Sequence, residues 1–378
     1  MAAPTDVRAR LAELAKLPPA ARPVVSVYLN TRWTDEDQRQ RVRIFLKNHL
    51  REARAAAERP AEEDLAWIEA EGQRLIDQVE LTDASGVALI AGGPGLREVL
   101  PVRAAFEDTF VVASTPYLRP LAGVAQDVVP ALVVFVDGVS ARLTALTPSG
   151  PGEELTLESE VPPRTSAGGW AALAQTKYTR HIEMHREQHF EATAAAIAAL
   201  VERHDVRRIV LAGEVRAVAN LRHHLSDPLG RRVVGVVAAA RHETSAVIAT
   251  RAADYLARLE EQEDADAVDR MLDAAAKGGR AVAGMEATLE AVNRNAVQHL
   301  YLARDFQRPG ATCERCLALR LPVSGACRFC GAATQPTELG EAMTTRVLAS
   351  GGGVSVLGRH AALDGLDGVG ALLRYMAA

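Results

Sequence analysis

The spacing of the four cysteines constrains this chain more than any other feature of its sequence. They occur as Cys313-Glu-Arg-Cys316 and, ten residues later, Cys327-Arg-Phe-Cys330. Each CxxC pair places two thiolates on one turn, and two such turns form a tetrahedral cage of four sulfur atoms that suits Zn²⁺. Four protein ligands leave no open coordination position, so the pattern predicts a structural zinc ribbon at about 311–333. Two alternatives remain open, namely a pair of disulfides and a site that has lost its metal.

Length, charge and hydropathy exclude several classes of protein. The 378 residues allow two or three domains, and 48% hydrophobic with 24% charged residues is typical of a globular chain. A net charge of −5 indicates that any contact with nucleic acid is made through local patches. The longest apolar run, about 131–136, is far shorter than the roughly 20 residues of a membrane span, and the first residues do not resemble a signal peptide. We therefore expect a soluble cytoplasmic protein with reduced thiols.

Hydrophobic periodicity predicts an α/β chain in three domains. We expect an N-terminal α/β domain over 1–127, a middle domain over 128–242 and a C-terminal α/β domain over 243–378 that contains the zinc ribbon. The elements expected in the middle domain are strands near 130–136 and 140–144, a connection over 148–169, a helix near 171–204, a strand near 208–211, a helix near 215–225 and a strand near 233–237. This order implies a parallel layer beside a hairpin.

A glycine pair before the long helix is the second candidate for chemistry. Gly168 and Gly169 precede Trp170, and the helix continues as Gln175-Thr-Lys177-Tyr178-Thr-Arg180. Glycines let a backbone approach a ligand closely, and a helix N-terminus favours anions. Trp170 can stack on a base or ribose while Lys177 and Arg180 meet phosphate. The alternative is an ordinary loop whose tryptophan packs against its own domain.

Basic and imidazole side chains also recur with helical spacing. The stretch 39–54 carries six basic residues against one glutamate, which is typical of a helix that lies along an RNA backbone. Its candidate RNA-binding residues are Arg39, Arg41, Arg43 and Lys47. The alternative is a solvated face paired with the acids at 35–37. Further along, His181, His185 and His189 share one helix face, but the charged residues among them indicate a solvated surface rather than a metal site.

Four segments of the chain resemble one family. They are Val133–Leu143, the Gly168-Gly169-Trp170 loop with its basic helix, Gly284–Val297, and Gly368-Val-Gly-Ala-Leu-Leu-Arg-Tyr375. In these segments the chain is similar to archaeal and eukaryotic class-one peptide-chain release factors, to Pelota, and to the bacterial branch of that superfamily, which includes the Balon-like ribosome hibernation factors. The resemblance implies a three-domain release-factor-like architecture, with a mixed sheet and a long helix in the middle domain.

The departures from this family bear on function. Trp170 stands at the glutamine position of the family's Gly-Gly-Gln loop, three residues near 171–173 lengthen the loop, and 1–126 has no Asn-Ile-Lys-Ser stop-codon loop. A displacement of about 1 Å can severely impair catalysis by positioning. The resemblance therefore implies a non-catalytic factor that binds rRNA in the A site of the 70S ribosome, acts in hibernation or protection, and meets a translational GTPase but neither DNA nor membrane. The alternatives are a peptidyl-tRNA ester hydrolase that uses Gln175, and a zinc-ribbon protein-interaction module.

Overall fold

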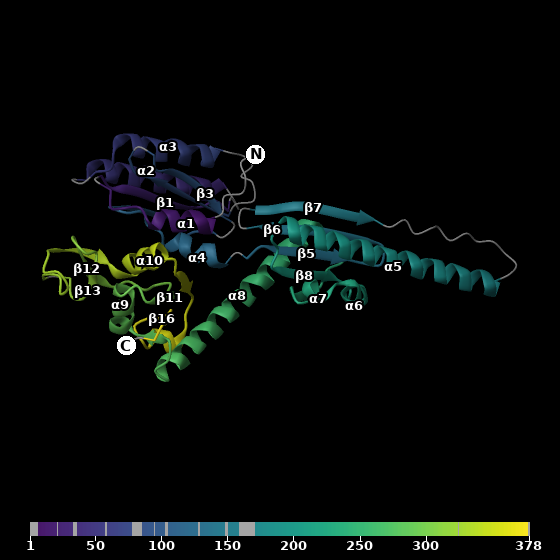
Figure 1. Ribbon diagram of the computed structural model, residues 1–378. Helices are drawn as coiled ribbons and strands as arrows, with labels where there is room; N and C mark the ends of the chain where they lie inside the picture. The colour runs from purple at the N-terminus through teal and green to yellow at the C-terminus, as the bar shows by residue number, and fades with distance from the viewer. Residues whose placement is uncertain are drawn as a thin grey trace. The chain divides into compact units, whose positions relative to one another are not determined.

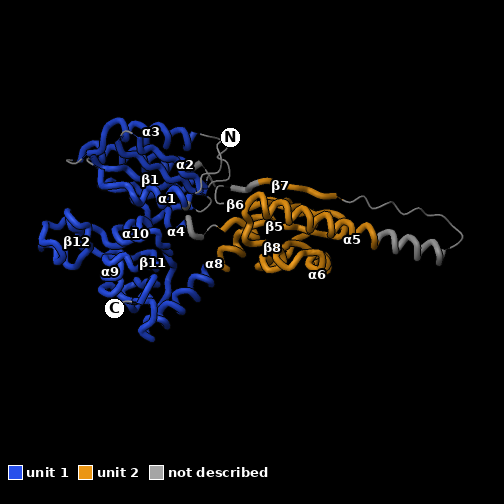
Figure 2. Tube along the Cα trace, viewed as in Figure 1, with its two compact units in different colours: residues 1–127, 260–378 blue, residues 128–259 orange. Residues whose placement is uncertain are grey.

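The chain, seen here as a computed structural model, forms two compact units (Figure 1, Figure 2). Unit 1 comprises residues 1–127 and 260–378, and unit 2 comprises residues 128–259. The mixed α/β fold class predicted from the sequence is confirmed. The boundary at 259/260 falls inside a helix, and the division into three domains stays a prediction. The structure describes residues 7–20, 22–32, 36–56, 59–77, 85–93, 95–102, 105–127, 129–147, 150–158, 171–323 and 325–376.

The first half of unit 1 is an antiparallel sheet between two layers of helices. Its strand order is β3-β2-β1-β4, and β1 is apolar and β-branched over most of its length, which suits a strand buried on both faces. One face packs against α2 and α3 through residues such as Val27 and Leu65, and the other packs against α1 and α4. The elements are α1 (Val7–Ala15), β1 (Val24–Asn30), α2 (Glu36–Ala55), α3 (Glu62–Asp77), β2 (Gly86–Ala91), β3 (Arg97–Val102), β4 (Thr109–Ala113) and α4 (Arg119–Asp127).

The second half of unit 1 holds two smaller sheets. A four-stranded sheet has the order β10-β16-β11-β15, with β11 and β15 parallel, and a three-stranded ribbon has the order β13-β12-β14. Helix α10 is capped by the carboxylate of Glu338, which accepts the backbone N–H groups of Gly340 and Glu341. The elements are β10 (Ala281–Ala283), α9 (Met285–Asn293), β11 (Val297–Ala303), β12 (Pro309–Cys313), β13 (Leu319–Arg320), β14 (Thr334–Glu338), α10 (Leu339–Ala349), β15 (Gly353–Leu357), α11 (Ala361–Asp364) and β16 (Val369–Leu373).

The two halves of unit 1 share one hydrophobic core. A single cluster of buried side chains runs from Leu11 and Tyr28 through Leu118 to Leu300 and Met343. Polar contacts reinforce it, because the Glu341 carboxylate accepts the backbone N–H groups of Leu118 and Arg119 at 2.7 and 3.1 Å. Segments separated by more than 200 residues therefore fold as one body.

Unit 2 is a five-stranded sheet covered by helices on both faces. The order is β7-β6-β5-β8-β9, and β5, β8 and β9 are parallel as expected. Helices α5 and α6 cover one face, and Phe190, Ile197 and Val201 of α5 are buried there, while the first half of α8 covers the other face. The elements are β5 (Ala131–Val136), β6 (Ser140–Thr147), β7 (Gly150–Glu158), α5 (Ala171–Arg203), β8 (Arg208–Gly213), α6 (Val215–His224), α7 (Asp227–Gly230), β9 (Val233–Val237) and α8 (Ser245–Ala276).

Strand β7 is a correction to the expected connection over 148–169. The sequence does not predict this strand, because it begins with Gly150, Pro151 and Gly152, which are typical of turns. The strand is stable because it lies at the sheet edge, where proline is tolerated, and pairs with β6 only.

In the described part of the chain, no helix is long and apolar enough to cross a membrane.

Candidate functional site

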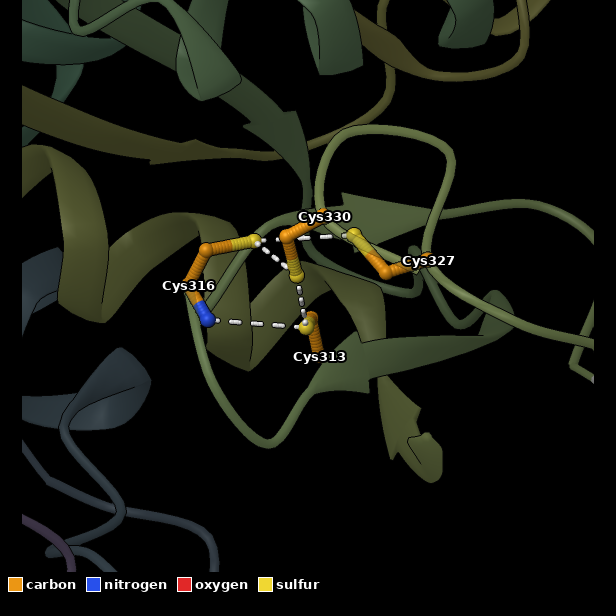
Figure 3. A group of neighbouring side chains, drawn as sticks. All are labelled: Cys313, Cys316, Cys327 and Cys330. Carbon is orange, nitrogen blue, oxygen red and sulfur yellow. Dashed lines mark hydrogen bonds between the residues drawn. The ribbon is translucent and has the colours of Figure 1, made fainter. Parts of the chain in front are cut away.

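The four cysteines converge at one end of the three-stranded ribbon (Figure 3). Cys313 ends β12 and Cys316 lies in the turn that follows, while Cys327 and Cys330 lie in a second turn before β14. The Sγ atoms of Cys313 and Cys330 are 3.4 Å apart, and Sγ of Cys316 lies 3.5 Å from Sγ of both Cys327 and Cys330. All four Sγ atoms lie within 4.8 Å of one another, so the predicted ligands are brought together.

This arrangement fits a tetrahedral zinc ion. With Zn–S bonds of about 2.3 Å, a regular tetrahedron of sulfur atoms has edges of about 3.8 Å, close to the 3.4–3.5 Å separations. The same separations are much longer than the roughly 2.05 Å of a disulfide bond, and the four side chains are free thiols. The geometry therefore favours the metal over the disulfide alternative. Among the described residues, these cysteines are the one group of three or more potential ligands close enough to hold an ion.

Backbone amides around the cluster favour the thiolate form that binds metal. The N–H groups of Cys316 and Arg315 point at Sγ of Cys313, 3.5 and 3.4 Å away. The hydrogen bond from Cys316, with help from Arg315, lowers the pKa of Cys313 to about 6 against the opposing effect of burial. The backbone N–H of Phe329 likewise lowers the pKa of Cys327. Against the hydrogen bond from the backbone of Ala318, burial and the neighbouring thiols raise the pKa of Cys316 to about 12. Thiolates are the form that ligates zinc, so the first cysteine of each turn is the one that favours a cation.

The two cysteine turns have the same backbone plan. The residue after the second cysteine of each pair is left-handed, with φ of 58° at Leu317 and 71° at Gly331. Its N–H donates to the carbonyl of the first cysteine, at 3.0 Å for Leu317 and 2.9 Å for Gly331. The ribbon is attached to α9 by Asn293, whose side chain exchanges two hydrogen bonds with the backbone of Leu319. Asn293 is a functional support that spacing alone did not indicate.

The glycine loop lies outside the described residues. Gly168, Gly169 and Trp170 belong to this part of the chain, so their predicted role stays a prediction. Gln175, Lys177 and Arg180 lie in the first three turns of α5, which begins at Ala171. The expected helix after the loop is therefore present.

The candidate RNA-binding residues lie on α2 but not on one face. At 3.6 residues per turn, Arg39, Arg43 and Lys47 form a stripe with a period of four, while Arg41 lies on another side of the helix. Arg43 donates to Asp77 at 3.3 Å and Arg39 reaches the carbonyl of Ile76, both at the end of α3. Lys47 is exposed and forms no ion pair with another described residue. The acid found beside this stripe is thus Asp77 of α3, while Asp35 and the side chain of Glu36 lie outside the described residues.

One histidine of the α5 series departs from the expected solvated face. His189 is only 2% exposed. Burial lowers the pKa of its imidazole, and a hydrogen bond to the backbone of Ser140 opposes the shift. The buried face includes His189 because Phe190 and Thr193 beside it pack toward the sheet. This histidine is part of the core, although charged neighbours in the sequence suggested solvent.

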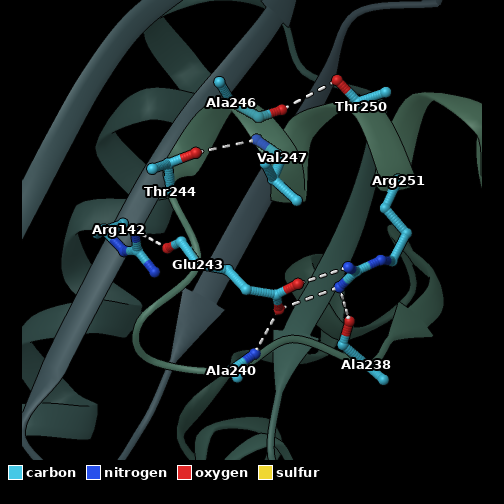
Figure 4. A network of polar contacts seen from close by, with 9 residues as sticks. All are labelled: Arg142, Ala238, Ala240, Glu243, Thr244, Ala246, Val247, Thr250 and Arg251. Carbon is cyan, nitrogen blue, oxygen red and sulfur yellow. Dashed lines mark hydrogen bonds and ion pairs between the residues drawn. The ribbon is translucent and has the colours of Figure 1, made fainter.

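A hollow of about 870 Å³ lies at the carboxyl ends of β5, β8 and β9 in unit 2. Its walls include Asp137, Gly213 and the loop 238–243. The charged groups there bind one another: Arg251 donates to both carboxylate oxygens of Glu243, which also accepts the N–H of Ala240 (Figure 4). The hydrogen bond from Arg251 is the main reason that the pKa of Glu243 falls to about 2. The network thus shapes the loop after β9, a feature that sequence reasoning missed.

The chain was compared with known proteins. Residues 116–263 match the model of bacterial archaeo-eukaryotic release factor family 10. The structure is similar to the archaeal translation termination factor aRF1, with 16% identity, 99% of both chains covered and a TM-score of 0.27. It is also similar to Archaeoglobus fulgidus Pelota (18% identity, 76% of this chain and 79% of that one, TM-score 0.37) and to a ribosome-bound archaeal Pelota solved with ABCE1 (14%, 100% and 96%, 0.42). No curated protein matches the chain.

Proposed function

Because residues 116–263 match the model of a bacterial archaeo-eukaryotic release factor family, we propose that the chain is a non-catalytic ribosome-binding factor of the Balon-like kind. In this proposal it occupies the A site of the 70S ribosome and protects it in hibernation. The loop Gly168-Gly169-Trp170 is held near the peptidyl-transferase centre, and the stripe Arg39, Arg43 and Lys47 on α2 contacts rRNA. The cysteine ribbon is held by one structural zinc ion and faces a partner such as a translational GTPase.

The observation that carries this proposal is the loop sequence inside the matched segment. Trp170 replaces the glutamine that positions a water in the family's hydrolases, and a tryptophan indole has one N–H donor and no acceptor for that water. The bulky ring is suited to stacking on a base. The loop therefore has a side chain that can stack on RNA, but it lacks the glutamine that would align a water for hydrolysis.

Co-sedimentation with 70S ribosomes tests the binding. We expect wild-type protein to pellet with ribosomes at low salt and to be released as salt rises, because phosphate contacts depend on salt. Trp170→Ala and Lys47→Glu are each expected to weaken binding by about tenfold, an order of magnitude for one stacked base or one repelled phosphate contact. Lys277→Glu is the matched control, since Lys277 is exposed in the turn after α8 and pairs only weakly with Asp273 at 3.8 Å. Absence of binding, including to ribosomes from starved cells, contradicts the proposal.

A hydrolysis assay separates the protective role from the enzymatic alternative. Stalled ribosomes that carry labelled peptidyl-tRNA are incubated with wild-type protein and with Gln175→Ala. We expect no release above buffer with either protein. Release that disappears in Gln175→Ala would establish the peptidyl-tRNA hydrolase instead, and binding to proteins without any ribosome association would favour the interaction module.

Zinc has its own test. Purified protein is expected to contain close to one zinc ion per chain, and Cys313→Ser is expected to lose the metal and destabilise the ribbon, because structural zinc contributes directly to folding. Thr312→Ser is the matched control, since it alters the neighbouring position in β12 without touching a sulfur atom. A metal-free protein of full stability would refute the site.

A further inference from the structure

The first cysteine turn carries a leucine where its twin carries a glycine. Leu317 and Gly331 occupy equivalent left-handed positions and make equivalent hydrogen bonds. Only glycine adopts this conformation without steric conflict between Cβ and the backbone, and a bulky side chain there is unusual. The left-handed backbone also directs the Leu317 side chain outward, where it is 52% exposed. Leu317 thus combines a left-handed backbone, which glycine adopts more readily, with an apolar side chain that is half exposed to water.

The second turn exposes an apolar side chain as well. Phe329 is 58% exposed, in a chain that has only seven phenylalanines. Leu317 follows Cys316 and Phe329 precedes Cys330, and the Sγ atoms of these two cysteines are 3.5 Å apart. Each apolar residue is therefore the chain neighbour of one of two cysteines whose sulfur atoms lie side by side.

Arginines are the main charged residues of the two cysteine turns. Between the first and last cysteine the chain has three arginines and one acid, Glu314. The guanidinium of Arg328 lies 4.8 Å from the centre of the Phe329 ring, and Glu314 accepts a hydrogen bond from Gln335. Arg315 and Arg328 are exposed, whereas Cys313 and Cys327 are buried. Arg315 and Arg328 are therefore accessible beside the two apolar side chains, together with the exposed Cys316.

We propose that Arg315, Leu317, Arg328 and Phe329, here called the knuckle face, bind an acidic amphipathic helix of a partner protein. Leu317 and Phe329 bury the apolar side chains of that helix, and Arg315 and Arg328 pair with its carboxylates at the rim. An aliphatic leucine offers neither a ring for stacking nor a hydrogen bond to a base, and one side of Phe329 is already occupied by Arg328. Protein rather than RNA is therefore the occupant. The proposal rests on the proposed function in taking the ribbon as zinc-bound.

In-cell photo-crosslinking identifies the occupant. The full chain carries p-benzoyl-phenylalanine in place of Phe329, and a second protein carries it in place of Lys277 as the control position. We expect a crosslink at 329 to a helical protein segment with more Asp and Glu than Lys and Arg. A synthetic copy of that segment is expected to bind the zinc-loaded full chain, and at least tenfold less tightly the variant Phe329→Ser. A crosslink to RNA, a crosslink to a segment that is not acidic, or no crosslink above the control overturns the proposal.

Leu317→Gly separates docking from structure. If Leu317 served folding, this change would lower zinc content and the denaturation midpoint. The docking role predicts instead an unchanged zinc content, a midpoint no lower than that of wild type, and at least fivefold weaker binding of the synthetic segment. Zinc content and co-sedimentation with 70S ribosomes, measured on the same preparations, show separately whether the ribbon site or the ribosome association has failed.

Discussion

Arg119 provides a direct test of how the two halves of unit 1 are held together. Its side chain is only 6% exposed, and its guanidinium donates hydrogen bonds to the carbonyls of Ala303 and Arg304 at 2.8 Å and to that of Phe306. Arg119→Met keeps the aliphatic stem and removes all three bonds. The change therefore tests the polar contacts separately from the packing around them.

The expected loss of stability depends on whether each of the three carbonyls keeps a hydrogen-bond partner in Arg119→Met. The carbonyl of Ala303 still accepts the N–H of Phe306 at 3.0 Å, so it keeps a partner. The carbonyl of Phe306 lies in a buried residue, where loss of a partner costs about 1–3 kcal/mol. Arg304 is exposed, so water partly replaces the guanidinium at its carbonyl. The variant also avoids burying a cation, which offsets part of this cost, so we expect a net loss of about 1–2 kcal/mol in the free energy of unfolding of unit 1.

Hydrogen exchange read by mass spectrometry measures this loss locally. Protection is expected to fall together in β1–β2 and in β11–β16, because both sheets contribute to one core. Arg74→Met is the matched control, since Arg74 is 48% exposed and pairs with Glu71 three residues away, and such pairs contribute about 0.5 kcal/mol or less. A loss below 1 kcal/mol in Arg119→Met, or a loss confined to one half, would refute the reasoning.

Three further predictions concern buried groups. Burial raises the pKa of Glu341 to about 7 from 4.5, so the folded state retains a proton that the unfolded state releases. The free energy of unfolding of unit 1 should therefore fall as pH rises from about 4.5 to 7, by at most about 3 kcal/mol. The same pH dependence in Glu341→Gln would contradict this prediction. Tyr28→Phe removes the fully buried hydroxyl that donates to the carbonyl of Tyr117, and urea denaturation should show a loss of about 1–2 kcal/mol. Gly213 has a φ of 135°, and Gly213→Ala places a Cβ 2.3 Å from the carbonyl oxygen of Val136. The midpoint of thermal unfolding of unit 2 should therefore fall by several degrees. An unchanged midpoint would show that the backbone relaxes.

Patterns within short stretches of sequence predicted much of the architecture. The periodicity of α5 and the apolar strands β5 and β8 rest on local side-chain preferences, so their boundaries agree closely with the structure. The sequence did not predict strand β7, because its stability comes from pairing with β6 and not from its own glycines and proline. The burial of His189 was missed for the same reason, since contacts with distant segments decide it.

The sequence by itself determined the cysteine cluster, because all four ligands lie within 18 consecutive residues and two turns suffice to bring them together. Its motifs also predicted a resemblance to release factors, and residues 116–263 match the model of a release factor family. Tertiary structure alone decided that Arg119 and Glu341, 222 residues apart, join the two halves of one unit, and that Arg43 of α2 pairs with Asp77 of α3. Contacts of this kind depend on which surfaces become buried together, and burial is a property of the whole fold and of no local pattern.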